Sequence, residues 1–243
     1  LGASAGTEPD GSIPGASVAG QIVAVMTDGI SAQWDLQQAV YESLNPNKAT
    51  DAAQDALCAL TGLARNPKVA SIVTGTCTGT PGTVLQVGRV ATVTGTLARF
   101  ATTAEKTIAA LTAWAQSTAY LVGDRRTANG NAYHCTVAGT SLGSGTGPSG
   151  TGTAIVDGTA TWRYLGVGTG AVDAPFQAEQ AGAIGALAGT LATIATPVFG
   201  WNNVVNLLDA VVGKLKETNT ELRIRREASL HANGLAATDA IRR

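Results

Sequence analysis

Residues 71–95 read SIVTGTCTGTPGTVLQVGRVATVTG. Valine and threonine favour β-strands, and glycines interrupt this run every few residues. Pro81-Gly82 suits a type II turn, because proline presets the first central position and glycine accepts the positive φ of the second. We therefore expect short strands joined by tight turns. Residues 168–200 have a similar composition, so residues 71–112 and 168–200 are expected to form one discontinuous β domain.

The N-terminal segment, residues 1–70, has the pattern of helices after a flexible leader over residues 1–12. Large apolar residues recur at spacings of three, four and seven, which predicts an amphipathic helix. These residues are Ile22, Met26, Ile30, Trp34, Tyr41 and Leu44. Asn45-Pro46 ends the helix, since the residue before a proline avoids the helical region. A second helix is expected from about Thr50 to Asn66-Pro67.

The C-terminal segment, residues 201–243, is also predicted to be helical. Thr218-x-x-Glu221 is a capping box, in which the two side chains satisfy backbone N–H groups at a helix N-terminus. Asn233-Gly234 suits the C-terminal end of the same helix.

An aromatic-rich island interrupts the β domain. Residues 113–167 contain five of the eleven aromatic residues and a glycine-rich loop, Gly139 to Gly152. This contrast predicts a small all-β insertion. The expected fold class is therefore α+β, with helical N-terminal and C-terminal segments flanking a Gly/Thr-rich β domain that carries the insertion.

The composition suits a part of an assembly. The 243 residues are 44% hydrophobic, which is enough for a sizeable core, and only 14% are charged. A net charge of −1 gives no reason to expect nucleic-acid or membrane partners. Residues 1–70 hold 3 basic and 7 acidic residues, whereas residues 201–243 hold 7 and 5. These ends are either ordinary solvated faces or complementary surfaces that meet in an assembly.

The sequence contains few signals for processing or for a cellular compartment. Cys58, Cys77 and Cys135 are widely spaced and form no C-x-x-C pair, which is typical of buried or free thiols in a reducing compartment. No apolar run is long enough for a transmembrane helix, and no signal peptide is visible. The chain has no initiator methionine, so we expect it to be processed or partial.

Motifs for catalysis lack the context that they need. Gly139-x-Ser141-x-Gly143 matches a nucleophile elbow, but that motif requires a following helix, and Gly, Ser and Thr follow here. Gly145-x-Gly147-x-x-Gly150 lacks the strand and helix of a dinucleotide site. His134 and Cys135 face opposite sides of a strand and have no further ligands nearby. We expect no enzyme, no cofactor and no metal.

The most specific resemblance lies near the C-terminus. Pro197-Val-Phe-Gly-Trp-Asn-Asn-Val-Val-Asn206 precedes Glu217-Thr-Asn-Thr-Glu-Leu-Arg-Ile-Arg-Arg226. Together with residues 34–46, 56–65 and 79–100, these segments resemble the baseplate J-like family of contractile phage tails and related injection machines. The family usually has a second glycine near Gly213 and continues further.

The resemblance implies a baseplate wedge subunit. Copies of the chain would join as a dimer or ring around the tail hub, contact other baseplate and tail proteins, and relay the trigger for sheath contraction. Its place would be the virion, in the tail baseplate, after assembly in the host cytoplasm. The expected subunit interface comprises Trp34, Tyr41, Leu222, Arg223, Arg225 and Arg226. The alternatives are an intramolecular core for the aromatic pair and a solvated face for the helix.

The insertion resembles small chitin-binding-type modules of phage tail proteins. The matching residues include Ala113-Trp114, Tyr120 to Asp124, Asn129 to Tyr133, and Asp157 to Tyr164. In such modules aromatic side chains stack on sugars, which implies cell-surface glycan or partner contact by Trp114, Tyr120, Tyr133, Trp162 and Tyr164. A module this small needs aromatics for its own core, so a structural role competes with the first. The alternative function is accordingly a glycan-binding tail adhesin.

Overall fold

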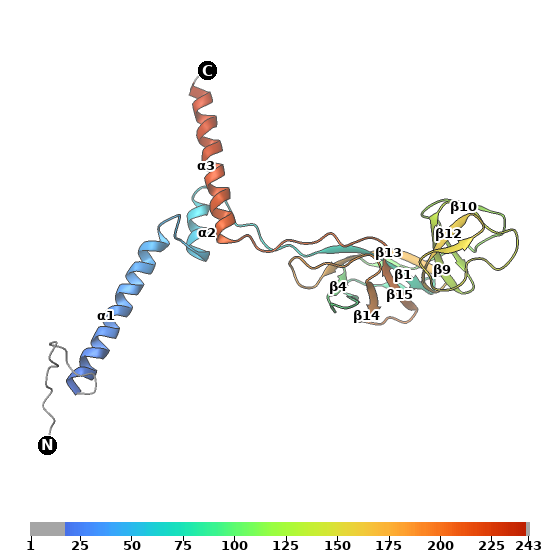
Figure 1. Ribbon diagram of the computed structural model, residues 1–243, viewed down its shortest axis with the longest axis horizontal. Coiled ribbons are helices and arrows are strands. Elements are labelled where there is room, and N and C mark those ends of the chain that lie inside the picture. The colour runs from blue at the N-terminus through green and yellow to red at the C-terminus, as the bar shows by residue number, and fades with distance from the viewer. Residues whose placement is uncertain (1–17, 242–243) are drawn as a thin grey trace. The chain divides into compact units, whose positions relative to one another are not determined.

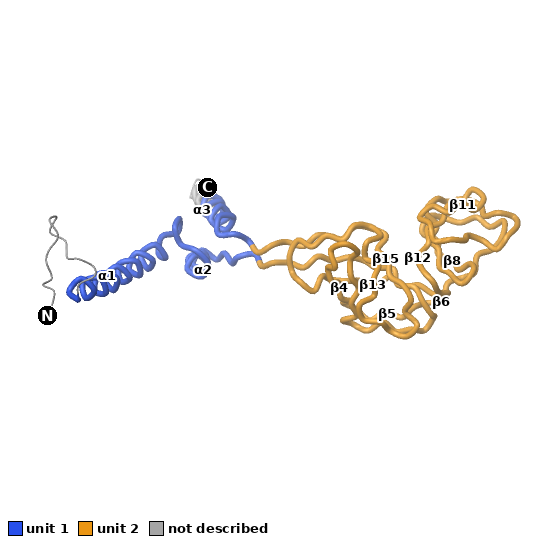
Figure 2. The backbone as a smooth tube through the Cα atoms, turned by 60° about the horizontal axis from the view of Figure 1, so that its bottom comes forward, with its two compact units in different colours: residues 1–66, 217–243 blue, residues 67–216 orange. Residues whose placement is uncertain are grey.

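The structure is a computed structural model that describes the backbone of residues 18–241 and side chains up to residue 232. The predicted leader, residues 1–12, lies outside this range. The chain forms two compact units (Figure 2). Unit 1 contains residues up to 66 together with residues from 217 onward, and unit 2 contains residues 67–216.

Unit 1 contains the three helices found among the described residues. They are α1 (Val18–Ser43), α2 (Asp51–Ala59) and α3 (Asn219–Ile241). α1 ends just before Asn45-Pro46, as predicted. α2 is shorter than predicted, because the chain turns back after Ala59 and the Leu63 amide donates to the carbonyl of Cys58 at 3.1 Å.

The start of α3 follows the predicted capping box. The Glu221 amide donates to Thr218 Oγ1 at 3.2 Å, and the Thr218 amide donates to Glu221 Oε2 at 2.8 Å. The predicted C-terminal end at Asn233-Gly234 is wrong, because α3 continues to Ile241. A single glycine costs a helix only about 1 kcal/mol relative to alanine, and the alanine-rich sequence that follows favours helix.

Unit 2 contains the strands. They are β1 (Ile72–Gly79), β2 (Val84–Leu85), β3 (Val90–Val93), β4 (Arg99–Thr102), β5 (Lys106–Thr107), β6 (Ala109–Ala110), β7 (Ala119–Tyr120), β8 (Arg125–Ala128), β9 (Asn131–Val137), β10 (Gly139–Thr140), β11 (Ile155–Asp157), β12 (Ala160–Val167), β13 (Gly170–Ala178), β14 (Leu191–Ile194) and β15 (Trp201–Asn206). The predicted type II turn is confirmed, since Thr83 N donates to Thr80 O at 3.2 Å and Gly82 has φ 88°.

A nearly closed antiparallel sheet forms the larger part of unit 2 (Figure 1). Its strand order is β14-β3-β4-β13-β1-β15, and β6 also pairs with β13. The two edge strands meet at the buried Asn206, whose side-chain oxygen accepts from Leu191 N at 2.9 Å. Its amide nitrogen donates to Leu187 O and Leu208 O, both at 2.8 Å. Because all its polar atoms are satisfied, this asparagine can lie in the interior and join the edges.

The sheet encloses an aliphatic core with few large aromatics. Its buried members include Val73, Cys77, Leu85, Phe100, Ile108, Phe176, Leu191, Trp201 and Val204. Inward residues alternate with outward ones along residues 173–178 of β13, as expected for a sheet with one buried face. The α+β expectation agrees with the structure at this coarse level of mixed helix and predominant strand.

The predicted helical segment 201–243 is wrong at its beginning. Residues Trp201–Asn206 form β15, which pairs with β1 along Gly75–Gly79. Trp201, Val204 and Asn206 are buried, and the residues between them are more exposed, which is closer to a strand pattern than to a helical one. The β domain therefore extends past residue 200.

The insertion forms a separate four-stranded sheet in the order β11-β12-β9-β8. Its core contains Tyr120, Ala128, Tyr133, Cys135, Ala160 and Trp162. Asp157 lies buried beside this core and accepts from Trp114 Nε1 at 2.7 Å and Trp162 Nε1 at 3.2 Å. Its other oxygen accepts from the Leu142 amide at 3.0 Å. One carboxylate therefore connects β11 to both tryptophans and to the glycine-rich loop.

Close backbone approach joins the insertion to the larger sheet. A side chain at Gly166, which has φ 149°, would collide with Thr78 and Asn203. Asn203 Nδ2 donates to Leu165 O at 2.6 Å. Asp173 accepts from Thr76 on its own sheet at 2.7 Å and from Arg125 of the insertion at 2.8 Å.

We predict that Asp157→Ala destabilises unit 2 by about 2–4 kcal/mol, because it leaves two indole N–H groups and one backbone amide without a buried acceptor. Denaturant unfolding monitored by tryptophan fluorescence measures this change. Val156→Ala is the matched control, since Val156 is exposed on the same strand and should shift stability by less than about 0.5 kcal/mol. Equal effects of the two substitutions would contradict the assigned role of Asp157.

Candidate assembly interface

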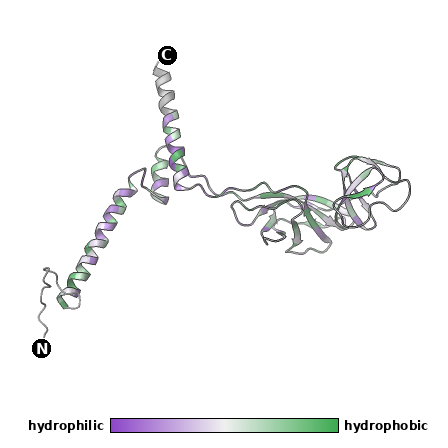
Figure 3. Ribbon diagram, in the orientation of Figure 1, coloured by the Kyte–Doolittle hydropathy of each residue, from purple (hydrophilic) through white to green (hydrophobic). Residues whose placement is uncertain are grey.

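α1 exposes a long apolar face. Ten large apolar side chains lie on it, each between 46% and 75% exposed: Val18, Ile22, Val23, Val25, Met26, Ile30, Trp34, Leu36, Val40 and Tyr41. At 100° per residue they cover roughly half of the helix circumference. Figure 3 shows hydrophobic and hydrophilic residues mixed along this helix. We call these ten residues the α1 apolar face. Contiguous exposed apolar surface of this kind marks an interaction site.

The other side of α1 is acidic. Asp28, Asp35 and Glu42 follow one another at seven-residue intervals, and α1 has no lysine or arginine. Glu42 binds Lys48 at 2.9 Å, and this contact lowers the pKa of the Glu42 carboxyl. Asp28 and Asp35 form no ion pair within residues 18–232. α1 thus separates an uncharged half from a negative half.

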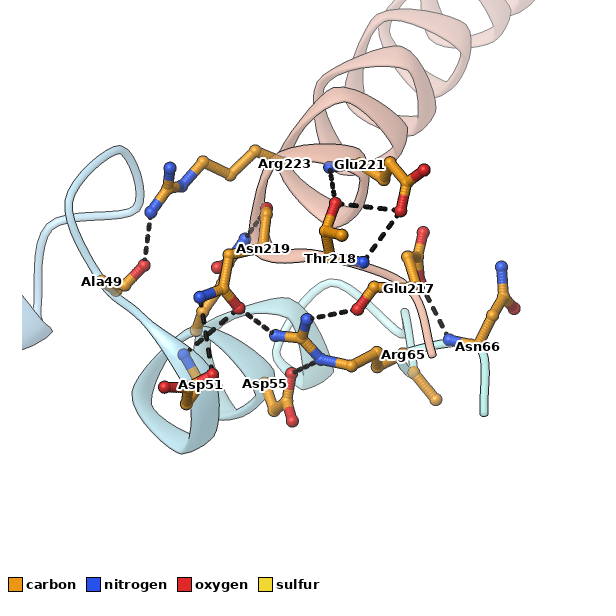
Figure 4. A network of polar contacts seen from close by, with 12 residues as sticks. Ala49, Asp51, Asp55, Arg65, Asn66, Glu217, Thr218, Asn219, Glu221 and Arg223 are labelled. Carbon is orange, nitrogen blue, oxygen red and sulfur yellow. Dashed lines mark hydrogen bonds and ion pairs between the residues drawn. The ribbon is translucent and has the colours of Figure 1, made fainter. Parts of the chain in front are cut away.

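A polar network holds α2 to the start of α3 (Figure 4). Arg65 Nε donates to Asp55 at 2.6 Å, and its terminal nitrogens donate to Glu217 O and Asn219 Oδ1, both at 2.8 Å. Gln54 Nε2 donates to Asn219 O at 2.7 Å. We call Asp55, Arg65, Glu217, Asn219 and Arg225 the Arg65–Glu217 network. It joins residues that are about 150 positions apart in the sequence.

Glu217 is the most strongly bound carboxylate of this network. Arg225 donates to both of its oxygens, each at 2.7 Å, and the Asn66 amide donates to Oε2 at 2.9 Å. Arginine and carboxylate match well in this two-bond geometry. The Arg225 contact, with smaller contributions from Asn66 and Arg65, lowers the pKa of Glu217 to about 2. The pKa of Arg225 rises in return.

Three of the four C-terminal residues expected at a subunit interface make contacts within their own unit. Leu222 is fully buried. Arg223 donates to Ala49 O at 2.7 Å, and Arg225 binds Glu217 and the carbonyl of Ala64. Arg226 Nε is buried without a hydrogen-bond partner. Leu222, Arg223 and Arg225 thus make contacts within their own unit, and the binding of another subunit by this helix face stays a prediction.

The two N-terminal residues of the expected interface have the opposite surroundings. Trp34 is 68% exposed and Tyr41 is 75% exposed, so neither lies in an intramolecular core. Sequence reasoning did not single out Arg65, Asp55 or Asn219 as a connected group. Adjacent sequence contains no signal for such a group, because its members come from two distant segments. The prolines after Asn45 and Asn66 indicate only where helical structure cannot continue.

The aromatic residues of the insertion are mostly in its core. Tyr120, Tyr133 and Trp162 are buried, and Trp114 and Tyr164 are partly buried. Tyr120 contacts Trp162 edge-to-face at a centroid distance of 4.9 Å, and Tyr133 contacts Tyr164 in the same way at 5.9 Å. A ring that stacks on a sugar needs an open face. The three buried rings lack one, so the structural role describes them better than glycan contact does.

The residues considered for chemistry are used for structure. Ser141 is buried, and its hydroxyl donates to Ala115 O at 2.8 Å and accepts from Thr118 N at 3.0 Å. Burial, together with Arg125, lowers the pKa of His134, whose Nδ1 is buried without a partner. The three cysteines are free and buried, and burial raises the pKa of Cys77 to about 12.

A scan against protein families finds no match, and a search of curated proteins finds none either. Within residues 18–241, no helix is long and apolar enough to cross a membrane. Residues 18–232, whose side chains the structure describes, contain no cluster of three or more histidine, cysteine, aspartate or glutamate side chains that could hold a metal ion.

We predict that unit 1 loosens in acid because of Glu217. Its folded pKa lies below its ordinary value of 4.5, so its contribution to stability is complete above that pH and is lost as pH falls toward about 2. Glu217→Gln should remove this dependence and destabilise unit 1 by about 1–3 kcal/mol at pH 7. Hydrogen exchange of residues 51–66 between pH 3 and pH 7 measures both effects.

Glu227→Gln is the control for this experiment. Glu227 lies exposed on the same helix and takes part in no ion pair among the described residues, so its loss should leave exchange unchanged. The comparison uses protection factors, because the intrinsic exchange rate itself falls toward acid. A loss of protection in acid that persists in Glu217→Gln would assign the acid sensitivity to another group.

Proposed function

We propose that the chain is a structural, non-enzymatic subunit of the baseplate wedge in a contractile phage tail. It would belong to the baseplate J-like family, stand beside other copies of itself around the tail hub, and relay the trigger for sheath contraction. Its partners would be other baseplate and tail proteins. Its place would be the virion, with assembly in the host cytoplasm.

The role of the C-terminal motif carries this proposal. Residues 217–226 are the most specific part of the resemblance, and they provide Glu217, Asn219, Leu222 and Arg225 to the packing of unit 1. A chance match would have no reason to coincide with the Arg65–Glu217 network, to which this segment contributes Glu217, Asn219 and Arg225. The coincidence supports an architectural rather than a catalytic role for the motif.

The α1 apolar face supports an assembly role. Trp34 and Tyr41 are large, rigid and exposed, and such side chains are frequent anchors of protein interfaces. In the proposed wedge this face contacts a neighbouring chain. The Arg65–Glu217 network then holds α2 and the start of α3 together while α1 makes the contact.

The glycan-binding adhesin is the second candidate, and the structure favours it less. The proposed sugar platform would need Tyr120, Tyr133 and Trp162, whose rings are buried in the insertion. Trp114 is partly covered, because a side chain at Gly147 would meet its indole ring at 2.7 Å. In the wedge proposal the insertion is an accessory module of unit 2 that folds around its own aromatic core.

Affinity capture of the tagged chain from phage-producing cells tests the proposal. We expect other tail and baseplate proteins to co-purify in fixed ratios, as measured by quantitative mass spectrometry. Gold-labelled antibody to the tag should mark the baseplate end of intact tails in electron micrographs.

Capture with an untagged chain is the control for non-specific recovery. A chain that is recovered alone and is retained on chitin or cell-wall glycan would overturn the wedge proposal in favour of the adhesin. Label along the whole tail, without enrichment at the baseplate, would also contradict it.

A further inference from the structure

We infer that α1 pairs with α1 of a second copy of this chain, parallel and in register, through the α1 apolar face. The inference names the neighbour of the proposed wedge, and it rests on the proposed function only for that setting. The pairing itself is a property of the helix and can be tested in purified protein.

The available area suits a stable dimer. α1 has 26 residues and is therefore about 39 Å long. Trp34 and Tyr41 can each bury roughly 150–250 Å². A standard interface needs roughly 800 Å² from each partner, so the eight aliphatic side chains must add only about 40–60 Å² each. All ten side chains are accessible to a partner.

Two glutamines in the middle of the apolar face argue for a second copy as the partner. Gln33 has Met26, Ile30, Leu36 and Val40 as its helical neighbours at spacings of three and seven. A buried amide needs both a donor and an acceptor opposite it. Another glutamine provides both, and a second copy brings one to the same level. A purely apolar partner would leave the amide unsatisfied.

Gln37 repeats the arrangement one turn later. Its neighbours at spacings of three, four and seven include Ile30, Trp34, Val40 and Tyr41. Two buried amides four residues apart define a register, in the way that a single polar core residue fixes register in coiled coils. The two glutamines therefore favour one alignment of the copies over those shifted by a turn.

The glutamines also favour the parallel orientation. In a parallel pair Gln33 meets Gln33 and Gln37 meets Gln37. An antiparallel pair that overlaps along the full helix places Gln33 at the level of Asp28 and Gln37 at the level of Ala24. Neither of these residues can bring an amide to the apolar face. The fully overlapped antiparallel pair would thus bury amides without partners. The shifted antiparallel register that places Gln33 opposite Gln37 overlaps only residues 27–43 and leaves the apolar side chains of Val18 to Met26 outside the pair.

Charge supports a second copy over a membrane surface. Asp28, Asp35 and Glu42 lie on the side away from the apolar face, so two copies can meet without bringing these acids together. Helices that lie on anionic membranes have basic residues on their polar side. α1 has none, which disfavours a lipid partner.

Analytical ultracentrifugation of the full chain tests the pairing. We expect a dimer at micromolar concentration. Ile30→Glu should weaken it about a hundredfold or more, because it would bury a charge in the apolar interface. Ser31→Glu is the matched control, since it adds the same charge to the adjacent position outside the apolar face and should leave the dimer intact.

Disulfide cross-linking tests orientation and register. Val40→Cys should form a dimer under mild oxidation, because parallel in-register pairing brings the two residues 40 within bridging distance. In the antiparallel pair they would be roughly 28 Å apart along the axis. Cys58, Cys77 and Cys135 are buried, so the new thiol is the reactive one. Asp35→Cys, on the acidic side, is the control that should not cross-link.

A chain that stays monomeric at 100 μM, or that is cross-linked as readily at residue 35 as at residue 40, would overturn the inference. If Ile30→Glu abolishes capture of other tail proteins from a monomeric chain, the α1 apolar face belongs to a different protein. That outcome would reject the homodimer and leave the wedge proposal standing. A stable dimer that never associates with tail proteins would support the homodimer and reject the wedge proposal.

Discussion

The bidentate contact between Arg225 and Glu217 is the constraint on which the helical unit depends. Glu217 links the first turns of α3 to the segment that ends at Asn66, because it accepts from both Arg225 and the Asn66 amide. Arg65 of the same segment also donates to the backbone carbonyl of Glu217. Charged groups that are partly removed from water need such complete pairing. Arg65 and Glu217 are 152 positions apart in sequence, so the network closes a long loop. Folding of unit 2 brings residues 67 and 216 together and so lowers the entropy cost of closing that loop.

A different solution holds the β unit together. Its sheet has two edges, and unpaired edges favour aggregation. The side chain of Asn206 joins them by bonding two backbone groups on the β14 side, Leu191 N and Leu187 O, and one on its own segment, Leu208 O. In the insertion, Asp157 has the corresponding role for two tryptophans and the glycine-rich loop. In both places a buried polar side chain positions segments that aliphatic packing alone would leave free to slide.

The sequence predicts local features of this fold well. The helix stop at Asn45-Pro46, the capping box at Thr218 and the turn at Pro81-Gly82 all follow from backbone chemistry within four residues, and the structure has each of them. The failures involve distant partners. β15 looks like part of a helical tail until β1 is placed beside it, and Arg225 looks free until Glu217 is seen to bind it. The spacing of apolar residues likewise cannot predict that Trp34 is exposed. An amphipathic helix has the same spacing whether its partner lies in the same chain or in another.

The adjacent ends of the β unit have a consequence for how such a chain can change. Val69 and Lys214 pair through two backbone hydrogen bonds, so the peptide leaves the β unit next to the place where it came in. The insertion, residues 113–167, repeats this arrangement one level down, because Leu111 and Thr169 are hydrogen-bonded where the module begins and ends. Each inner segment therefore enters and leaves its host at adjacent backbone positions. A segment with adjacent ends can be exchanged or lengthened without separating the host strands that hold those ends, which is the usual condition for tolerated domain insertion.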